Sequence, residues 1–81
     1  MSAERQKQLI EFIVRGLVER PEEVVVQKAG PGEQGEVLEL RVAPEDRGKV
    51  IGKNGRTAHA IRTLLAASSR EGHRTALEII D

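Results

Sequence analysis

The stretch that most restricts the fold of this chain is RGKVIGKNGRTAHAIR, residues 47–62, in which Gly52 and Gly55 bracket two polar residues. Residues on both sides of this tetrad suit helices, although the stretch before it is short. Glycine disfavours a helix interior and adopts backbone conformations that a Cβ forbids. The tetrad therefore predicts a sharp turn that joins a short helix, over residues 47–51, to a longer one after Gly55.

An N-terminal helix is predicted by apolar residues that recur at the spacing of one helical face. These residues are Leu9, Ile10, Ile13, Val14, Leu17 and Val18. Pro21 cannot continue a helix, so this one should end around Glu19 or Arg20. Phe12, the single aromatic residue of the chain, lies within this helix and is expected to pack in the core.

Three strands are expected, two of them before the tetrad. The β-branched run at residues 24–26 predicts the first, and the glycines and proline of residues 30–35 predict the turn after it. Residues 37–42 alternate in hydropathy, which predicts a half-buried strand that pairs with the first. Its inner face holds Leu38, Leu40 and Val42. Residues 75–80 predict the last strand.

The helix after Gly55 has one side that is expected to face the core, and Gly72 should stop it. That side holds Ala58, Ile61, Leu64, Leu65 and Ser68. Pro44 suits the first turn of the short helix before the tetrad. The order α-β-β-α-α-β predicts an α+β fold of two layers, a small sheet covered on one face, in a single domain over residues 1–81.

Charge is distributed unevenly along a chain whose formal net charge is zero. Residues 1–46 contain six basic and ten acidic side chains, whereas residues 47–74 contain seven basic ones and only Glu71 as an acid. A basic segment within a neutral domain suits a polyanion on one surface. A solvated helix face without a partner remains the alternative at this stage.

A nucleotide-hydrolysing loop does not fit the tetrad. The P-loop pattern G-x-x-x-x-G-K-[ST] requires a hydroxyl after the lysine, but Asn54 follows Lys53, and Gly48 is one residue too near. There is no cysteine, and the two histidines therefore have no cysteine partners for a metal site. Neither an enzyme activity nor a metal or cofactor is expected.

A clamp for successive phosphates fits better. Glycines at both ends let another backbone approach closely, and the following helix directs unpaired N–H groups and its positive dipole end at the same place. Lys53 and Arg56 add full charges, and Asn54 adds a neutral donor.

At these residues a resemblance becomes definite. The run VIGKNGR with Ala58 and Ile61 after it is similar to the V-I-G-x-x-G core of KH domains. Residues 9–80, including RPEEVVV and RTAHAIRTLL, resemble the stand-alone KhpA family of bacterial KH proteins, in the type II arrangement. The resemblance implies a three-stranded mixed sheet with three helices on one face. It also implies binding of single-stranded RNA, and a homodimer or a heterodimer with a KhpB/Jag-type KH protein.

Carried over by position, the resemblance makes residues 52–55 the loop and places Ile51 and Ala58 in an apolar groove under the bases. Val50 would share that groove, with Val42 or Leu40 opposite. Many KH domains have a larger aliphatic residue in place of Ala58, so base selectivity is not implied. The expected RNA-contacting residues are Lys49, Val50, Ile51, Gly52, Lys53, Asn54, Gly55, Arg56, Ala58 and Arg62.

The function expected from all of this is non-catalytic RNA binding, as a post-transcriptional regulator or RNA chaperone. The rival hypothesis is a dimerisation scaffold in which RNA is secondary, with an interface over residues 37–42 or on the face of Thr63, Ala66 and Ala67. The N-terminal residues lack the apolar segment of a signal peptide, and no apolar run could span a membrane, which predicts a cytoplasmic location. No small-molecule substrate is expected.

Overall fold

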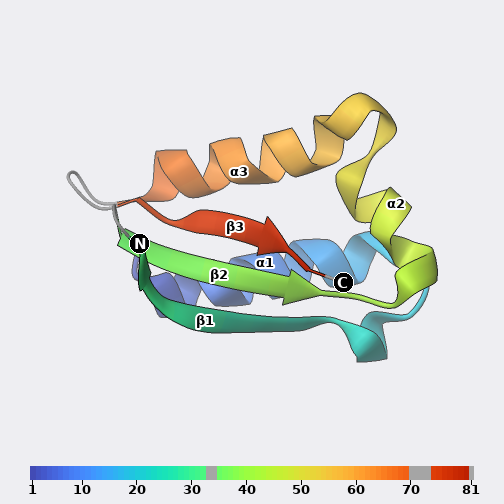
Figure 1. Cartoon of the computed structure of the whole chain (residues 1–81), viewed down its shortest axis with the longest axis horizontal. Helices are drawn as coiled ribbons and strands as arrows, with labels where there is room; N and C mark the ends of the chain where they lie inside the picture. The colour runs from blue at the N-terminus through green and yellow to red at the C-terminus, as the bar shows by residue number, and fades with distance from the viewer. Residues whose placement is uncertain (33–34, 70–73, 81) are drawn as a thin grey trace.

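The structure, a computed structural model, describes residues 1–32, 35–69 and 74–80. Its elements follow the predicted α-β-β-α-α-β order (Figure 1). They are α1 (Ala3–Leu17), β1 (Val25–Gly32), β2 (Gly35–Arg41), α2 (Arg47–Ile51), α3 (Arg56–Ser68) and β3 (Ala76–Ile79). Short 3-10 turns lie between them: η1 (Pro21–Glu23), η2 (Pro44–Asp46) and η3 (Lys53–Gly55).

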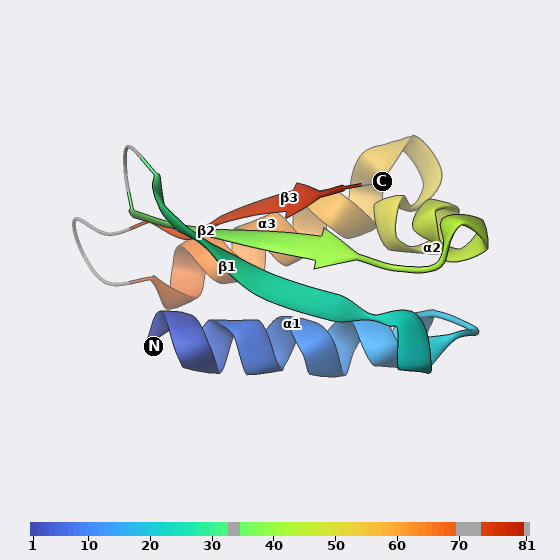
Figure 2. The ribbon, with the colours of Figure 1, turned by 60° about the horizontal axis from the view of Figure 1, so that its bottom comes forward.

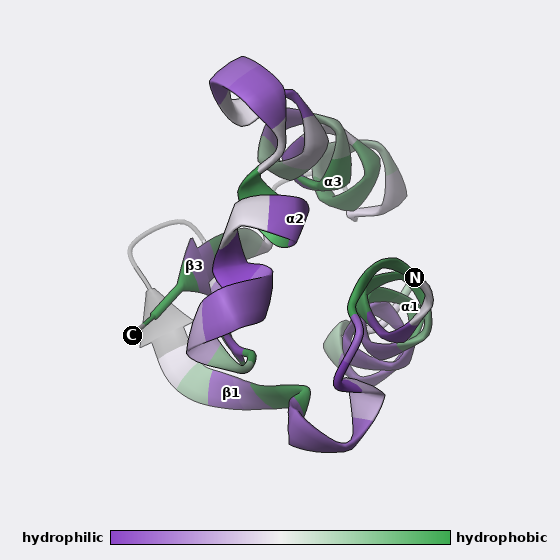
Figure 3. Ribbon diagram, turned by 90° about the vertical axis from the view of Figure 1, so that its right-hand side faces the viewer, coloured by the Kyte–Doolittle hydropathy of each residue, from purple (hydrophilic) through white to green (hydrophobic). Residues whose placement is uncertain are grey.

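The three strands form one mixed sheet in the order β1-β2-β3. Strands β1 and β2 are antiparallel, with Val25 opposite Arg41, and β2 runs parallel to β3, with Leu38 opposite Leu77. Helices α1 and α3 lie side by side on the same face of this sheet, and no described helix covers its other face (Figures 2 and 3). The predicted α+β, KH-like architecture is confirmed.

The core lies between that face and the two long helices. Its members are the apolar residues that the periodicity of α1, β2 and α3 directs inward. Ile10, Val14, Leu38, Leu40, Ile61, Leu65 and Leu77 are all buried there. No helix among the described residues has the length and hydropathy needed to cross a membrane.

The first strand is longer than predicted. It continues through Gly30 to Gly32, where a turn was expected, with an irregular register between Lys28 and Pro31. Because β1 is an edge strand, a proline without an N–H is tolerated there. At the start of β2, Gly35 has a φ of 146°, and a Cβ at this position would lie 2.1 Å from the backbone oxygen of Arg74. Glycine is therefore required at this close approach.

Three side chains expected inside lie outside: Leu17, which is 41% exposed, Phe12 and Leu64. The buried stripe of α1 is Gln6, Ile10 and Val14, so Phe12 projects from the other side of the helix and is 78% exposed. Leu64 is 48% exposed, because it points about one quarter of a turn away from the direction of the buried residues of α3. The predicted apolar faces were too wide at Leu17 and Leu64, whereas Phe12 was expected to pack only because it lies within the first helix.

The ends of the long helices also differ from the predictions. Helix α1 ends at Leu17, before the expected Glu19, and its N-cap Ser2 accepts a hydrogen bond from the N–H of Arg5. Helix α3 ends at Ser68, whereas the expected stop, Gly72, lies outside the described residues.

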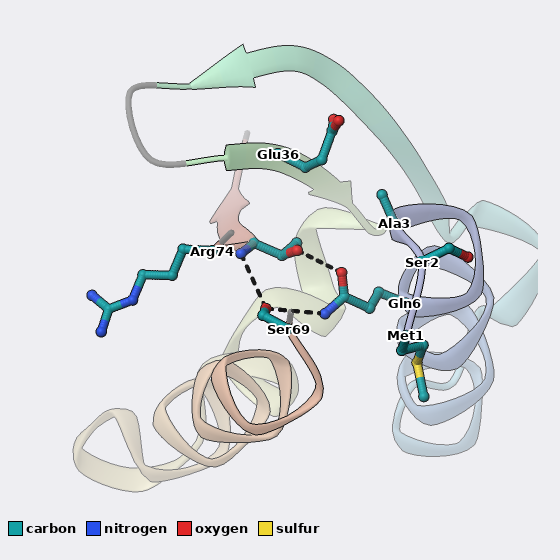
Figure 4. Close-up of a pocket in the computed structure, with 8 residues that line it drawn as sticks. Met1, Ser2, Ala3, Gln6, Glu36, Ser69 and Arg74 are labelled. Carbon is teal, nitrogen blue, oxygen red and sulfur yellow. Dashed lines mark hydrogen bonds between the residues drawn. The ribbon is translucent and has the colours of Figure 1, made fainter. Parts of the chain in front are cut away.

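The buried side-chain amide of Gln6 links the start of α1 to the C-terminal end of α3. Gln6 Nε2 donates to Leu65 O at 3.2 Å and to Ser68 Oγ at 2.9 Å. It also donates to Ser69 Oγ at 3.3 Å (Figure 4). The hydroxyl of Thr75 donates to Gln6 Oε1. One side chain of α1 is thus bound to both the end of α3 and the residue before β3. Its burial is tolerated because its polar atoms have partners.

Candidate nucleic-acid interface

The tetrad forms a tight turn between α2 and α3 in which positive φ angles recur. Gly52 has φ 79° and ψ 169°, Asn54 has φ 57° and ψ 26°, and Gly55 has φ 75° and ψ 12°. The N–H of Gly55 donates to the oxygen of Gly52 at 3.1 Å and closes the turn. Asparagine is among the few residues other than glycine that adopt this left-handed conformation readily, which suits position 54.

The two glycines of the tetrad meet different requirements. At Gly52, an added Cβ would lie 2.2 Å from Thr57 Oγ1 and 2.8 Å from the backbone nitrogen of Thr57. At Gly55, nothing lies within 4 Å of the same added atom. Gly52 is therefore fixed by both its backbone angles and its packing, and Gly55 by its backbone angles alone.

The N-terminus of α3 is open and positively charged. None of the described side chains caps it, and its first turn contains no acidic residue. Lys53, Asn54 and Arg56 are exposed around it. Within the part of the chain that the structure describes, Lys53 and Arg56 form no salt bridge. Uncapped N–H groups and the helix dipole make such an end a site for anions.

An apolar groove with an open top lies directly beside this helix end. It encloses about 620 Å³, and its lining residues are Pro44, Arg47, Ile51, Gly55, Ala58, Arg62 and Ile79. Ile51 is 43% exposed, whereas Ala58 is almost fully buried, at the base of the groove. Among the residues expected to contact RNA, the structure brings Ile51, Gly55, Ala58 and Arg62 together here.

Val50, Leu40 and Val42 do not line this groove. All three are buried members of the core, and Val50 has no exposed surface. Neighbouring residues on a helix point about 100° apart, so α2 directs Val50 into the core and Ile51 into the groove. The expected pairing of Val50 with a β2 residue around the bases is therefore wrong in this structure.

Lys49 also lies elsewhere than the groove. Its Nζ is 3.5 Å from Glu19 Oε1 and 3.5 Å from Asp46 Oδ1. Asp46 is fully buried and accepts hydrogen bonds from the backbone N–H groups of Glu19 and Arg20, at 3.2 and 3.0 Å. Lys49 is thus held in a contact that completes the turn after α1.

The Asp46 carboxyl is stabilised in its charged form. Burial alone would raise its pKa, but the backbone hydrogen bonds from Glu19 and Arg20 and the charge of Lys49 together outweigh burial. The pKa of Asp46 therefore lies below its usual value of 3.8.

Three residues of the groove were not predicted from the sequence: Pro44, Arg47 and Ile79. The i, i+4 spacing of Arg47 and Ile51 on α2 could have placed Arg47 on the same side of that helix. Ile79 could not have been found in this way, because only the parallel pairing of β3 with β2 brings it beside α3.

Comparison with known proteins gives one consistent result. The family model described as KhpA/KhpB, KH domain, matches residues 7–79. The chain is 60% identical to the "RNA-binding protein KhpA" of Treponema pallidum, over 94% of this chain and 95% of the relative. It is 56% identical to that of Clostridium acetobutylicum, over 91% and 99%, and 50% identical to that of Leifsonia xyli, over 85% and 88%. No solved structure matches.

Proposed function

Because this chain belongs to the KhpA/KhpB family of KH domains, we propose that it binds single-stranded RNA through the loop at Gly52–Gly55 and the groove beside it. It is an RNA-binding protein, as its relatives are named. The observation that supports this site most directly is the uncapped, basic start of α3 next to an apolar groove. KH domains clamp about four nucleotides of backbone at such a loop.

The loop suits the phosphate of a nucleotide, and the groove suits its base. Phosphates would pass over the turn near Gly55, where nothing lies within 4 Å of an added Cβ and the start of α3 can be approached closely. Lys53 and Arg56 would lower the potential energy of those phosphates and make affinity sensitive to salt. The bases would lie against Ile51 and Ala58, which offer apolar contact surface.

A second KH domain would raise the affinity. The single aromatic residue, Phe12, lies outside the groove lining, so bases would have no aromatic stacking partner there, and one domain should bind weakly. Two linked domains bind with higher avidity. We propose a homodimer, or a heterodimer with a KhpB-type protein, that uses the exposed face of α3 around Thr63, Leu64 and Ala67. Strand β2 is central in the sheet, so its edges are already paired.

In this role the protein acts by binding, without catalysis, as a post-transcriptional regulator or RNA chaperone. Its compartment would be the cytoplasm, where bacterial RNA is made and translated. Regulation of this kind requires only that RNA bound to the protein differ from free RNA in its folding or its accessibility.

The double variant Lys53→Asp/Asn54→Asp tests the clamp. It replaces a positive and a neutral donor with two charges that repel phosphate, so gel shifts with single-stranded RNA should show at least about tenfold weaker binding. The matched control is Lys7→Asp/Gln8→Asp, which makes the same charge change on α1 near the opposite end of the molecule (Figure 1). Circular dichroism verifies the fold of both. Equal RNA affinity of the two folded variants would exclude the loop as the clamp.

Sedimentation with and without RNA tests the scaffold alternative. A dimer that is indifferent to RNA, together with RNA affinity that does not fall as salt rises, would favour a scaffold over an RNA-binding module. We expect the opposite for RNA affinity, a steep decrease with salt.

A further inference from the structure

Arg62 lies between the groove and the last strand. It is on α3 one turn after Ala58, and it lines the groove together with Ile51 and Ile79. Its Nε and Nη2 both donate to the backbone oxygen of Leu77, each at 3.3 Å. Two hydrogen bonds to one oxygen fix the plane of the guanidinium, which a single bond would leave free to rotate.

The oxygen of Leu77 is available because β3 is an edge strand. The N–H of Ile80 donates inward to Leu40 O at 2.9 Å, so the alternation along a strand turns the backbone groups of Leu77 outward, toward α3. The fold itself thus supplies the acceptor that holds Arg62. Such an oxygen would otherwise be an unpaired group at a sheet edge.

The held guanidinium still has donors to offer. Leu77 O accepts from the edge formed by Nε and Nη2. Both N–H groups of Nη1 and the second N–H of Nη2 remain as donors. These remaining donors are nearly parallel, and the group has no acceptor. It therefore complements a ligand edge that presents two neighbouring acceptors with no donor between them.

Two of the four RNA bases have such an edge. Guanine presents O6 and N7, the commonest partner of arginine in base recognition, and cytosine presents O2 beside N3. Adenine places an amino donor next to N7 and N1, and uracil places an N–H between its two oxygens, so each would oppose a guanidinium donor with another donor.

We propose that Arg62, held in plane by Leu77 O, makes the groove prefer guanine or cytosine over adenine and uracil. The inference rests on the proposed RNA-binding function and adds a specificity-determining residue to it. Ile51, Ala58 and Ile79 offer apolar contact surface for the base beside the Arg62 guanidinium. A contact from Arg62 to a phosphate would use the same donors but would show no base preference.

The test uses the full chain and oligouridine RNA with one central G, C, A or U, with affinity measured by fluorescence anisotropy. We expect G or C to increase the affinity by about fivefold or more over A and U. Arg62→Lys keeps the charge but loses the planar fork, so it should weaken binding of the G and C RNAs more than that of oligouridine and discriminate by less than about twofold. Arg41→Lys, on the uncovered side of the sheet, is the matched control and should keep the preference.

A second measurement requires no change to the protein. Replacing the central G with 7-deazaguanosine, or the central C with 3-deazacytidine, deletes one acceptor of the pair and should abolish the gain. The proposal is overturned if all four bases bind alike, if adenine or uracil is preferred, or if Arg62→Lys keeps the preference. Failure of RNA binding as such would look different, because Lys53→Asp/Asn54→Asp weakens all four RNAs alike and leaves their ratios unchanged.

Discussion

The turn after α1 and the turn after α2 lie at the same end of the molecule (Figure 1). They differ in whether a side chain accepts hydrogen bonds from their backbone N–H groups. After α1, the N–H groups of Glu19 and Arg20 are both bonded to the buried carboxylate of Asp46. After α2, the helix that begins beyond Gly55 has no side-chain cap. A buried carboxylate completes the first turn, whereas in the second the N–H groups of Gly55 and Arg56 donate to backbone oxygens and no described side chain caps the helix.

This difference shows how a small domain separates stability from binding. Asp46, an acid of the kind that can cap a helix start, is instead buried. Its carboxylate fixes the connection between α1 and β1. The first turn of α3 contains no acid, so no side chain competes with phosphate for its N–H groups. Changes at the completed turn should therefore alter stability, and changes at the open turn should alter RNA binding.

The largest effect is expected for Gly52→Ala, which removes the open turn. Its Cβ would meet both the side chain and the backbone nitrogen of Thr57, in a backbone conformation that L-residues rarely adopt. We expect a loss of roughly 2 to 4 kcal/mol in the free energy of unfolding, from overpacking and strain together. Urea denaturation measures it, and RNA binding should be lost as well. An alanine variant as stable as the wild type would show that the turn is not constrained as described.

A smaller effect is expected for Asp46→Asn, which disrupts the completed turn. The amide has only one oxygen to serve the N–H groups of Glu19 and Arg20, and its NH₂ opposes one of them. The urea midpoint at pH 7 should fall, whereas the RNA affinity of the folded protein should stay within about twofold, since Asp46 lies outside the groove lining. Loss of RNA binding by a folded variant would mean that the two turns are coupled.

The same variant gives a pH test with a definite sign. The pKa of Asp46 is lowered in the folded protein, so its contribution to stability is fully present above pH 3.8 and is lost as the pH falls through the folded pKa. The difference in urea midpoint between wild type and Asp46→Asn should therefore be constant from pH 7 to pH 5 and shrink below pH 3.8. A constant difference down to the lowest pH at which both proteins fold would contradict the lowered pKa.

The smallest effect is expected for Gly55→Ala, which strains the open turn without a clash. Nothing lies near the added Cβ, so the cost is that of a left-handed backbone, about 1 kcal/mol. Gly48→Ala is the control, because Gly48 lies within α2 with free space around it and alanine favours the helix by up to about 1 kcal/mol. Thermal melts of the two variants should move in opposite directions, and equal shifts would indicate that backbone angle is not the cause.

Local sequence patterns were sufficient for most of the fold, because the relevant physics is local. The helical spacing around Val14 and Leu65, the helix-ending Pro21 and the glycines of the tetrad each act within a few residues. Strand β1 was underestimated for the same reason: Gly30 and Pro31 resemble a turn unless one knows that β1 is an edge strand. The turn at residues 52–55 was predicted correctly because glycine spacing is visible in a sequence.

The groove was predicted less well, because it is assembled from segments that are distant in the sequence. Whether Val50 or Ile51 faces it depends on the rotation of a helix of five residues, which no pattern that short defines. The partner of Lys49 is a buried carboxylate, and the contact of Arg62 is a backbone oxygen of another strand. Such contacts follow from topology and not from the periodicity of any one element.

The Gln6 network also has a consequence for how the protein forms. It joins residue 6 to residue 75, so closure of nearly the whole chain must precede its hydrogen bonds. Strand β3, which completes the sheet, is also synthesised after all the other elements. During synthesis the emerging chain cannot finish its core until residues 76–79 have left the ribosome, and before Thr75 emerges the Gln6 Oε1 lacks the hydroxyl that donates to it. Folding should therefore be completed only after β3 has emerged.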